Sequence, residues 1–121
     1  MARVLVIDDE PDVVRLVLKV LSGRGHVVQV VRDGASALTR VKHEPPDVIL
    51  IDSDLPKIDG AEVCRRIKVD AATQRIPIVM MTASYIDIYD VGAEGGPDAF
   101  VVRPFVREVL ANAVERVLFR R

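Results

Sequence analysis

The stretch Val48-Ile49-Leu50-Ile51-Asp52 decides the fold of this chain. Its apolar residues do not alternate with polar ones and are mostly β-branched, which is typical of a strand covered on both faces in a parallel sheet. Three other short runs have the same character: Val4-Leu5-Val6-Ile7, Ile78-Val79-Met80-Met81 and Ala99-Phe100-Val101-Val102. A fifth run, Val27-Val28-Gln29-Val30-Val31, has a polar residue at its centre and is predicted to be an edge strand.

Segments with helical periodicity separate these runs. The clearest four begin near residue 10, after Gly34, after Gly60 and near residue 106. Residues 84–97 could hold a short helix, which several glycines and Pro97 then break. Regular alternation of strands and helices predicts an α/β fold with right-handed crossovers, in which helices cover both faces of one parallel sheet. No linker or low-complexity segment divides residues 1–121, so we expect a single domain.

The composition excludes several classes of protein. The chain has 17 Lys+Arg and 18 Asp+Glu, and this balance gives no general attraction to nucleic acid or an anionic membrane. One cysteine, Cys64, allows neither an internal disulfide nor a cysteine metal cage, and we expect it to be a small buried hydrophobe. No stretch approaches the roughly 18 apolar residues of a membrane span. A cytoplasmic location is therefore predicted, and His26 and His43 are expected to face solvent.

Polar side chains follow the predicted strands at the edge where such sheets bind ligands. Asp8 and Asp9 follow the first strand, and Asp52 and Asp54 lie at the end of the third. Carboxylates that are brought together repel one another, and oxygen ligands of this kind suit Mg²⁺, which also binds phosphate oxygens. Thr82 and Arg103 follow the last two strands and could donate to a phosphoryl group, while a carboxylate can itself be the nucleophile.

The chain resembles the receiver domain of bacterial two-component response regulators over essentially its whole length. The resemblance rests on five motifs in order: Val4-Leu5-Val6-Ile7-Asp8-Asp9-Glu10, Pro46-Asp47-Val48-Ile49-Leu50-Ile51-Asp52-Ser53-Asp54-Leu55-Pro56, Asp59-Gly60, Met81-Thr82-Ala83 and Arg103-Pro104-Phe105. It implies a flavodoxin-like (βα)5 fold with strand order 2-1-3-4-5. It also implies a signalling phosphoacceptor whose only chemistry is its own phosphotransfer and autodephosphorylation.

The resemblance assigns roles residue by residue. Asp52 matches the phosphoacceptor, Asp9 a direct metal ligand, and Asp8 an acid that reaches the metal through water. The backbone carbonyl of Asp54 matches a third protein ligand. Thr82 matches the switch hydroxyl, and Phe100 matches the aromatic switch. The implied cofactor is Mg²⁺, with Mn²⁺ as a substitute.

The implied partners are a sensor histidine kinase or phosphotransfer protein, and a downstream target that contacts the fourth helix, fifth strand and fifth helix. A monomer or weak dimer is expected.

Three departures from the family pattern keep an alternative open. Arg103 stands where the family has lysine, and arginine and lysine are not interchangeable at a tight site. Gly96-Pro97 precedes the fifth strand in place of the usual Gly-Ala, and Asp54 places a further acid at the mouth of the site. Arg103 and the irregular fourth helix that the glycines before Pro97 predict leave open a degenerate receiver that acts as a constitutive protein-interaction module. A small phosphohydrolase of similar fold is a third candidate, although 121 residues leave no room for a cap domain.

Simpler structural roles compete with these assignments. The three acids Asp8, Asp9 and Asp52 could cap the helices or turns that follow them, as could Thr82. Arg103 could be a surface ion-pair partner, and Phe100 could be an ordinary core residue. The spatial arrangement of these side chains distinguishes the two interpretations.

Overall fold

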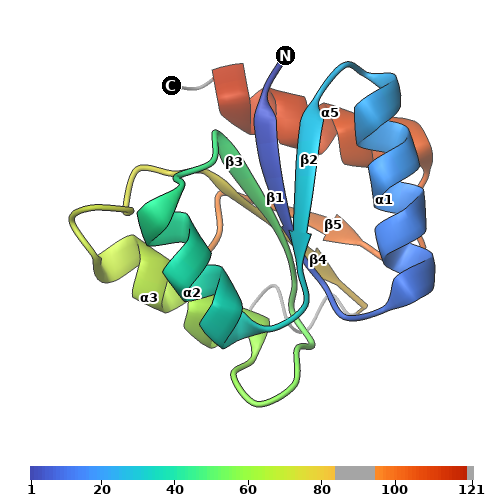
Figure 1. Cartoon of the computed structure of the whole chain (residues 1–121). Helices are drawn as coiled ribbons and strands as arrows, with labels where there is room; N and C mark the ends of the chain where they lie inside the picture. The colour runs from blue at the N-terminus through green and yellow to red at the C-terminus, as the bar shows by residue number, and fades with distance from the viewer. Residues whose placement is uncertain (84–94, 120–121) are drawn as a thin grey trace.

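A computed structural model describes residues 1–83 and 95–119 and contains a five-stranded parallel sheet in the order β2-β1-β3-β4-β5 (Figure 1). Its strands are β1 (Arg3–Ile7), β2 (Val27–Val31), β3 (Val48–Asp52), β4 (Ile78–Thr82) and β5 (Ala99–Val102). Both the predicted fold class and the predicted strand order are confirmed. The run with the central glutamine, β2, lies at one edge and pairs only with β1.

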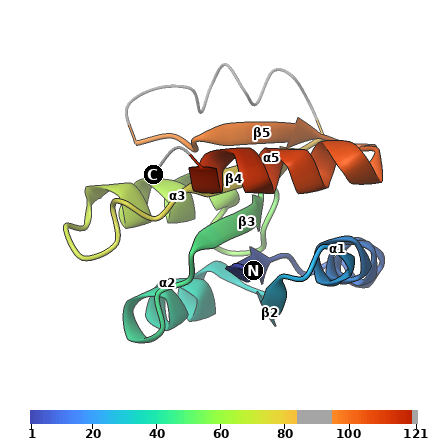
Figure 2. The same ribbon diagram turned by 90° about the horizontal axis from the view of Figure 1, so that it is seen from above.

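Helices cover both faces of the sheet, as Figure 2 shows from above. Their bounds are α1 (Pro11–Gly23), α2 (Gly34–His43), α3 (Gly60–Val69) and α5 (Arg107–Phe119). One hydrophobic cluster joins the sheet to α1 and α5, and a second joins it to α2 and α3. Val48 and Leu50 belong to the first cluster, whereas Ile49 and Ile51 belong to the second. This is why the strand has no polar alternation: successive residues enter two different cores.

Local chemistry fixes where the helices begin. Pro11 occupies the start of α1, where its missing N–H costs no hydrogen bond. Asp33 accepts a hydrogen bond from the backbone N–H of Ser36 at 2.7 Å, and Asp59 accepts one from that of Glu62 at 2.9 Å. These side-chain caps satisfy N–H groups that have no partner within their own helix. The expected short helix within residues 84–97 falls mainly on residues 84–94, outside the described residues.

His26 corrects one prediction. Its side chain is only 7 % exposed, and its Nε2 lies 3.0 Å from Oε2 of Glu115 on α5. Its Nδ1 accepts the backbone N–H of Ala2 at 3.2 Å, so the ring proton resides on Nε2 and points to Glu115. The expectation of a solvent-facing His26 was therefore wrong, because an acid 89 residues later in the sequence covers it. His43 is exposed and Cys64 is buried, as predicted.

None of the four helices within residues 1–83 and 95–119 is long and apolar enough to cross a membrane.

Candidate functional site

Three acids come together at the carboxyl edge of the sheet. Asp8 and Asp9 follow β1, and Asp52 is the last residue of the neighbouring strand β3. One carboxylate oxygen from each lies within 4.8 Å of the others. Asp8 and Asp52 are buried, whereas Asp9 is exposed. The cluster arises because parallel register places the ends of β1 and β3 side by side, with Ile7 opposite Ile51.

One carboxylate oxygen of Asp8 lacks a hydrogen-bond partner among the described residues. Its Oδ1 accepts the backbone N–H of Glu10 at 2.9 Å, but its buried Oδ2 has no hydrogen-bond partner among the described residues. Burial raises the pKa of Asp8 to about 6 against the pull of the Glu10 hydrogen bond, and the negative charges of Asp52 and Asp9 add to the rise. An orphaned carboxylate oxygen beside two further acids fits a hard divalent cation, which takes oxygen ligands.

One carboxylate oxygen of Asp52 accepts two hydrogen bonds. Its Oδ1 accepts the backbone N–H of Asp54 at 3.2 Å and Nη2 of Arg103 at 2.9 Å. Burial raises the pKa of Asp52, while the Asp54 hydrogen bond and the Arg103 charge oppose this rise. The side chain is 4 % exposed. Asp52 is thus a nearly buried carboxylate that faces a single guanidinium group and two other acids.

Arg103 bridges two acids. Its Nη1 lies 3.3 Å from Oε2 of Glu10, at the start of α1, while Nη2 contacts Asp52. The side chain is 19 % exposed, and its buried Nε has no hydrogen-bond partner among the described residues. Arg103 is therefore not a plain surface ion-pair partner. Glu10, which the sequence presented only as a residue next to two aspartates, is part of the same network.

Thr82 and Phe100 reach different surroundings. Thr82 ends β4 beside β3 and is fully buried, and its backbone carbonyl accepts the N–H of Arg103 at 2.7 Å. Phe100 lies in β5 and packs, partly buried, against the core cluster beneath α2 and α3. Thr82 therefore lies at the carboxyl end of its strand, where the acids are, whereas Phe100 is the second residue of β5 and lies nearer the amino end of that strand. Asp54 is exposed beyond the end of β3, and its N–H anchors Asp52.

Gly60 allows α3 to begin against the end of β3. A Cβ atom built at this position would lie 2.1 Å from the backbone oxygen of Asp52 and 2.8 Å from Cα of Ser53. Real Cβ atoms do not approach backbone so closely, so only glycine fits here without movement of the chain. The Asp59-Gly60 pair therefore caps a helix and admits it beside the acceptor strand.

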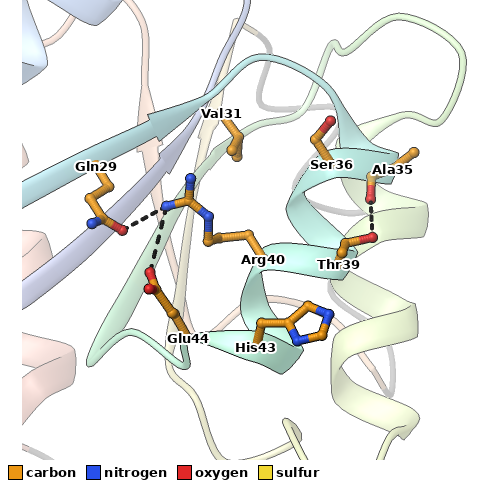
Figure 3. Close-up of a pocket in the computed structure, with 8 residues that line it drawn as sticks. All are labelled: Gln29, Val31, Ala35, Ser36, Thr39, Arg40, His43 and Glu44. Atoms are coloured by element: carbon orange, nitrogen blue, oxygen red, sulfur yellow. Dashed lines mark hydrogen bonds and ion pairs between the residues drawn. The ribbon is translucent and has the colours of Figure 1, made fainter.

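A wide groove lies elsewhere, between β2 and α2, with a volume of about 900 Å³ (Figure 3). In the close-up, Arg40 and Thr39 are bonded to other residues that line the groove. Arg40 donates to Gln29 at 2.8 Å and lies 3.9 Å from Glu44. Thr39 donates to the backbone carbonyl of Ala35. None of the three clustered acids lines this groove.

Comparison with known proteins agrees with this geometry. Residues 4–115 match the family model of the response regulator receiver domain. The chain is 40 % identical over 120 residues to the DNA-binding response regulator MtrA of Mycolicibacterium smegmatis, an alignment that covers 98 % of this chain and 51 % of that protein. The chain thus spans about half the length of the curated relatives it matches.

Two solved structures are close in shape. A putative response regulator from Chloroflexus aurantiacus has a TM-score of 0.93 and 32 % identity, with 98 % of each chain covered. The receiver domain of the sensor histidine kinase PA1611 of Pseudomonas aeruginosa has a TM-score of 0.89 and 26 % identity, again with 98 % of each chain covered, and has a magnesium ion in its active-site cleft. This chain belongs to the response regulator receiver family of two-component systems.

Proposed function

We propose that Asp52 of this receiver domain accepts a phosphoryl group from the phosphohistidine of a sensor histidine kinase or a phosphotransfer protein. The observation that carries the proposal is the asymmetric environment of this carboxylate. Both of its hydrogen bonds within the described residues are accepted by Oδ1, which leaves Oδ2 as the nucleophilic oxygen. Burial raises the pKa of Asp52, and the Arg103 guanidinium limits that rise, which favours the ionised form that a nucleophile needs.

The reaction is a direct phosphoryl transfer. Oδ2 of Asp52 forms a bond to phosphorus as the phosphorus–nitrogen bond to the donor imidazole breaks, and the nitrogen keeps the electron pair. The product is an acyl phosphate on Asp52, whose added charge Arg103 partly neutralises. Thr82, at the end of the neighbouring strand, is proposed to donate its hydroxyl hydrogen to a phosphoryl oxygen.

The donor set fits Mg²⁺. Asp8, Asp9 and Asp52 would hold the ion together with the backbone carbonyl of Asp54, and Mn²⁺ would substitute. When bound, the ion neutralises the acid cluster and the charge of the transferred group. The orphaned Oδ2 of Asp8 supports this assignment, as does the magnesium ion in the related PA1611 receiver domain. A cation would also remove the mutual repulsion that raises the pKa of Asp8.

Signal output is proposed to follow from the change of charge at Asp52. Movement of Thr82 toward the phosphoryl group would alter the packing of Phe100 and, with it, the face formed by β5 and α5. A target that prefers the altered face would then bind more tightly. MtrA is a DNA-binding response regulator. The present chain matches about half of it, so no DNA contact is assigned to these 121 residues.

Labelling with acetyl phosphate tests the acceptor. With Mg²⁺ we expect the mass increase of one phosphoryl group on the wild-type chain, and we expect loss of that increase in Asp52→Asn. A matched control is Asp12→Asn, which removes an exposed acid whose one ion pair within residues 1–83 and 95–119 is with Arg15, and this variant should label normally. Stoichiometric acyl phosphate on the Asp52→Asn chain, or labelling of the wild type that is unchanged by EDTA, would refute the assignment.

The degenerate-receiver alternative has one observation in its favour, because Arg103 already neutralises Asp52 without any ligand. NMR with beryllofluoride, a phosphoryl mimic, distinguishes the two functions. A phosphorylation-dependent receiver should show shifts both at the acid cluster and along β5 and α5. Shifts confined to the acid cluster would favour the constitutive interaction module.

A further inference from the structure

The guanidinium group of Arg103 has a different environment at each of its three nitrogens. Nη2 donates to Oδ1 of Asp52 at 2.9 Å, and Nη1 donates to Oε2 of Glu10 at 3.3 Å. Nε is buried and has no hydrogen-bond partner among residues 1–83 and 95–119. A buried N–H without a partner is costly, and so it indicates a partner that joins in another state of the molecule.

The unpaired Nε shares one edge of the guanidinium with Nη2, the nitrogen that contacts Asp52. In arginine the Nε–H and one Nη2–H bond point the same way and form a fork that matches two oxygens of a carboxylate or phosphate. Asp52 uses only the Nη2 half of this fork. A phosphoryl group on Asp52 adds oxygens where the present carboxylate has none, so one of them could accept from Nε as well.

Glu10 holds the opposite side of the group. Its carboxylate contacts Nη1, which is not part of the Nε–Nη2 edge, and so it does not compete with a phosphoryl oxygen for those donors. The Glu10 side chain is 56 % exposed, whereas that of Arg103 is 19 % exposed. Glu10 follows β1 and Arg103 follows β5, so the contact joins loops 93 residues apart in the sequence. It limits rotation of the guanidinium about its side-chain axis.

We propose that Glu10 is a positioning residue that orients Arg103, so that its Nε–Nη2 edge binds the phosphoryl group on Asp52 through two hydrogen bonds. This proposal rests on the proposed function, since it requires a phosphoryl group on Asp52. It also explains how an arginine can contact the phosphoryl group at the position where the family has lysine. A planar fork needs to be oriented, and lysine, with an ammonium group that rotates freely, has no such need.

A double-mutant cycle tests the orientation. Beryllofluoride affinity is measured by NMR at saturating Mg²⁺ for the wild type, Glu10→Gln, Arg103→Lys and the double variant. An exposed ion pair is worth about 0.2–1 kcal/mol, which corresponds to roughly a 1.5- to 5-fold change in affinity. We expect the effect of Glu10→Gln on beryllofluoride affinity to be less favourable by about this factor in the arginine background than in the lysine background. Glu10 is also an anion near the site, but that long-range effect persists with lysine and cancels in the cycle.

A second measurement reads the side chain itself. Rotation about the Nε–Cζ bond of Arg103, followed by its Nε–H signal in ¹⁵N NMR, should be slow in the wild type and faster in Glu10→Gln. Asp12→Asn is the matched control, since it removes an equal charge without touching Arg103, and it should leave the rotation rate unchanged and show only the long-range charge effect on affinity.

Equal effects of Glu10→Gln in both backgrounds, or an unchanged rotation rate, would overturn the positioning role while leaving phosphoryl acceptance intact. A wild-type chain that binds no beryllofluoride would overturn the proposed function itself, and the positioning role with it.

Discussion

Asp8 and Asp9 are neighbours in the sequence but differ in environment. Asp8 is fully buried with one orphaned oxygen, whereas Asp9 is exposed. Asp8 is therefore the acid whose charge is most costly when no cation is bound, since its buried Oδ2 has no hydrogen-bond donor among the described residues. Residues that bind a metal often lower the stability of the protein without it, and Asp8 is the residue at which this trade-off should be measurable.

The first prediction concerns the stability of the metal-free protein with asparagine in place of Asp8. The pKa of Asp8 is about 6 in the folded chain against 3.8 when unperturbed. The folded state thus binds more protons than the unfolded state between about pH 4 and 6, and stability falls as pH rises through this window. Above it the penalty is complete, at about 3 kcal/mol as an upper limit. In EDTA at pH 7.5, the free energy of unfolding of Asp8→Asn, measured by urea denaturation, should therefore exceed that of the wild type by about 1–3 kcal/mol.

The same variant separates this effect from a general gain in stability. The difference between Asp8→Asn and the wild type should shrink as the pH falls to about 4 and below, because the wild-type acid is then increasingly protonated in both states. Added Mg²⁺ should stabilise the wild type and leave Asp8→Asn nearly unchanged. Asp12→Asn, at an exposed acid, should match the wild type throughout. A wild type that is more stable than Asp8→Asn in EDTA would contradict the trade-off.

At the scale of the elements, α3 is the helix most tightly constrained by the site. Its first residue, Gly60, leaves no space for a Cβ atom beside the backbone of Asp52, whereas Gly23 at the end of α1 has nothing within 4 Å of its own missing Cβ. Neither glycine has a positive φ angle, so the two positions differ in space and not in backbone conformation. They form a matched pair for one substitution.

Alanine at these two glycines should have opposite effects. Gly60→Ala must push α3 away from β3 or distort the end of β3, and we expect a loss of about 2–4 kcal/mol in urea unfolding. Gly23→Ala should be neutral or stabilising by up to about 1 kcal/mol, because alanine reduces the entropy of the unfolded chain without strain. Gly60→Ala should also weaken Mg²⁺ binding, since the carbonyl and carboxylate of Asp52 move together. Equal stability of the two variants would mean that α3 can shift freely.

The elements were largely readable from the sequence, because their signals are local. Apolar runs marked the strands, while Pro11, Asp33 and Asp59 marked the helix starts. Contacts between distant residues were not readable in this way. His26 gave no sign of its pairing with Glu115, and Glu10 gave none of its contact with Arg103. Side chains separated by 89 and 93 residues meet only after the strands have paired, and a single sequence has no local pattern for such a meeting.

The whole molecule has two polar ends separated by the sheet. The acid cluster lies at the carboxyl ends of the strands. His26, which lies just before β2, links the amino ends of the strands. It accepts a hydrogen bond from the backbone N–H of Ala2, just before β1, and its ring pairs with Glu115 of α5. Strands of five residues rise about 3.3 Å per residue, which separates the two ends by about 16 Å. The side chains of the sheet between the two ends are mostly apolar, so few polar groups could couple a change of charge at one end to the other.

The last prediction is that these two ends contribute to stability independently. Glu115→Gln weakens its hydrogen bond to His26 and removes its ion pair with Arg24, which should cost about 1 kcal/mol because Glu115 and Arg24 are partly exposed. Mg²⁺ affinity should not change. In EDTA the double variant Asp8→Asn/Glu115→Gln should show the sum of the two single effects within about 0.5 kcal/mol, as distant sites do. Coupling above about 1 kcal/mol would mean that the two ends of the strands are not independent in their contributions to stability.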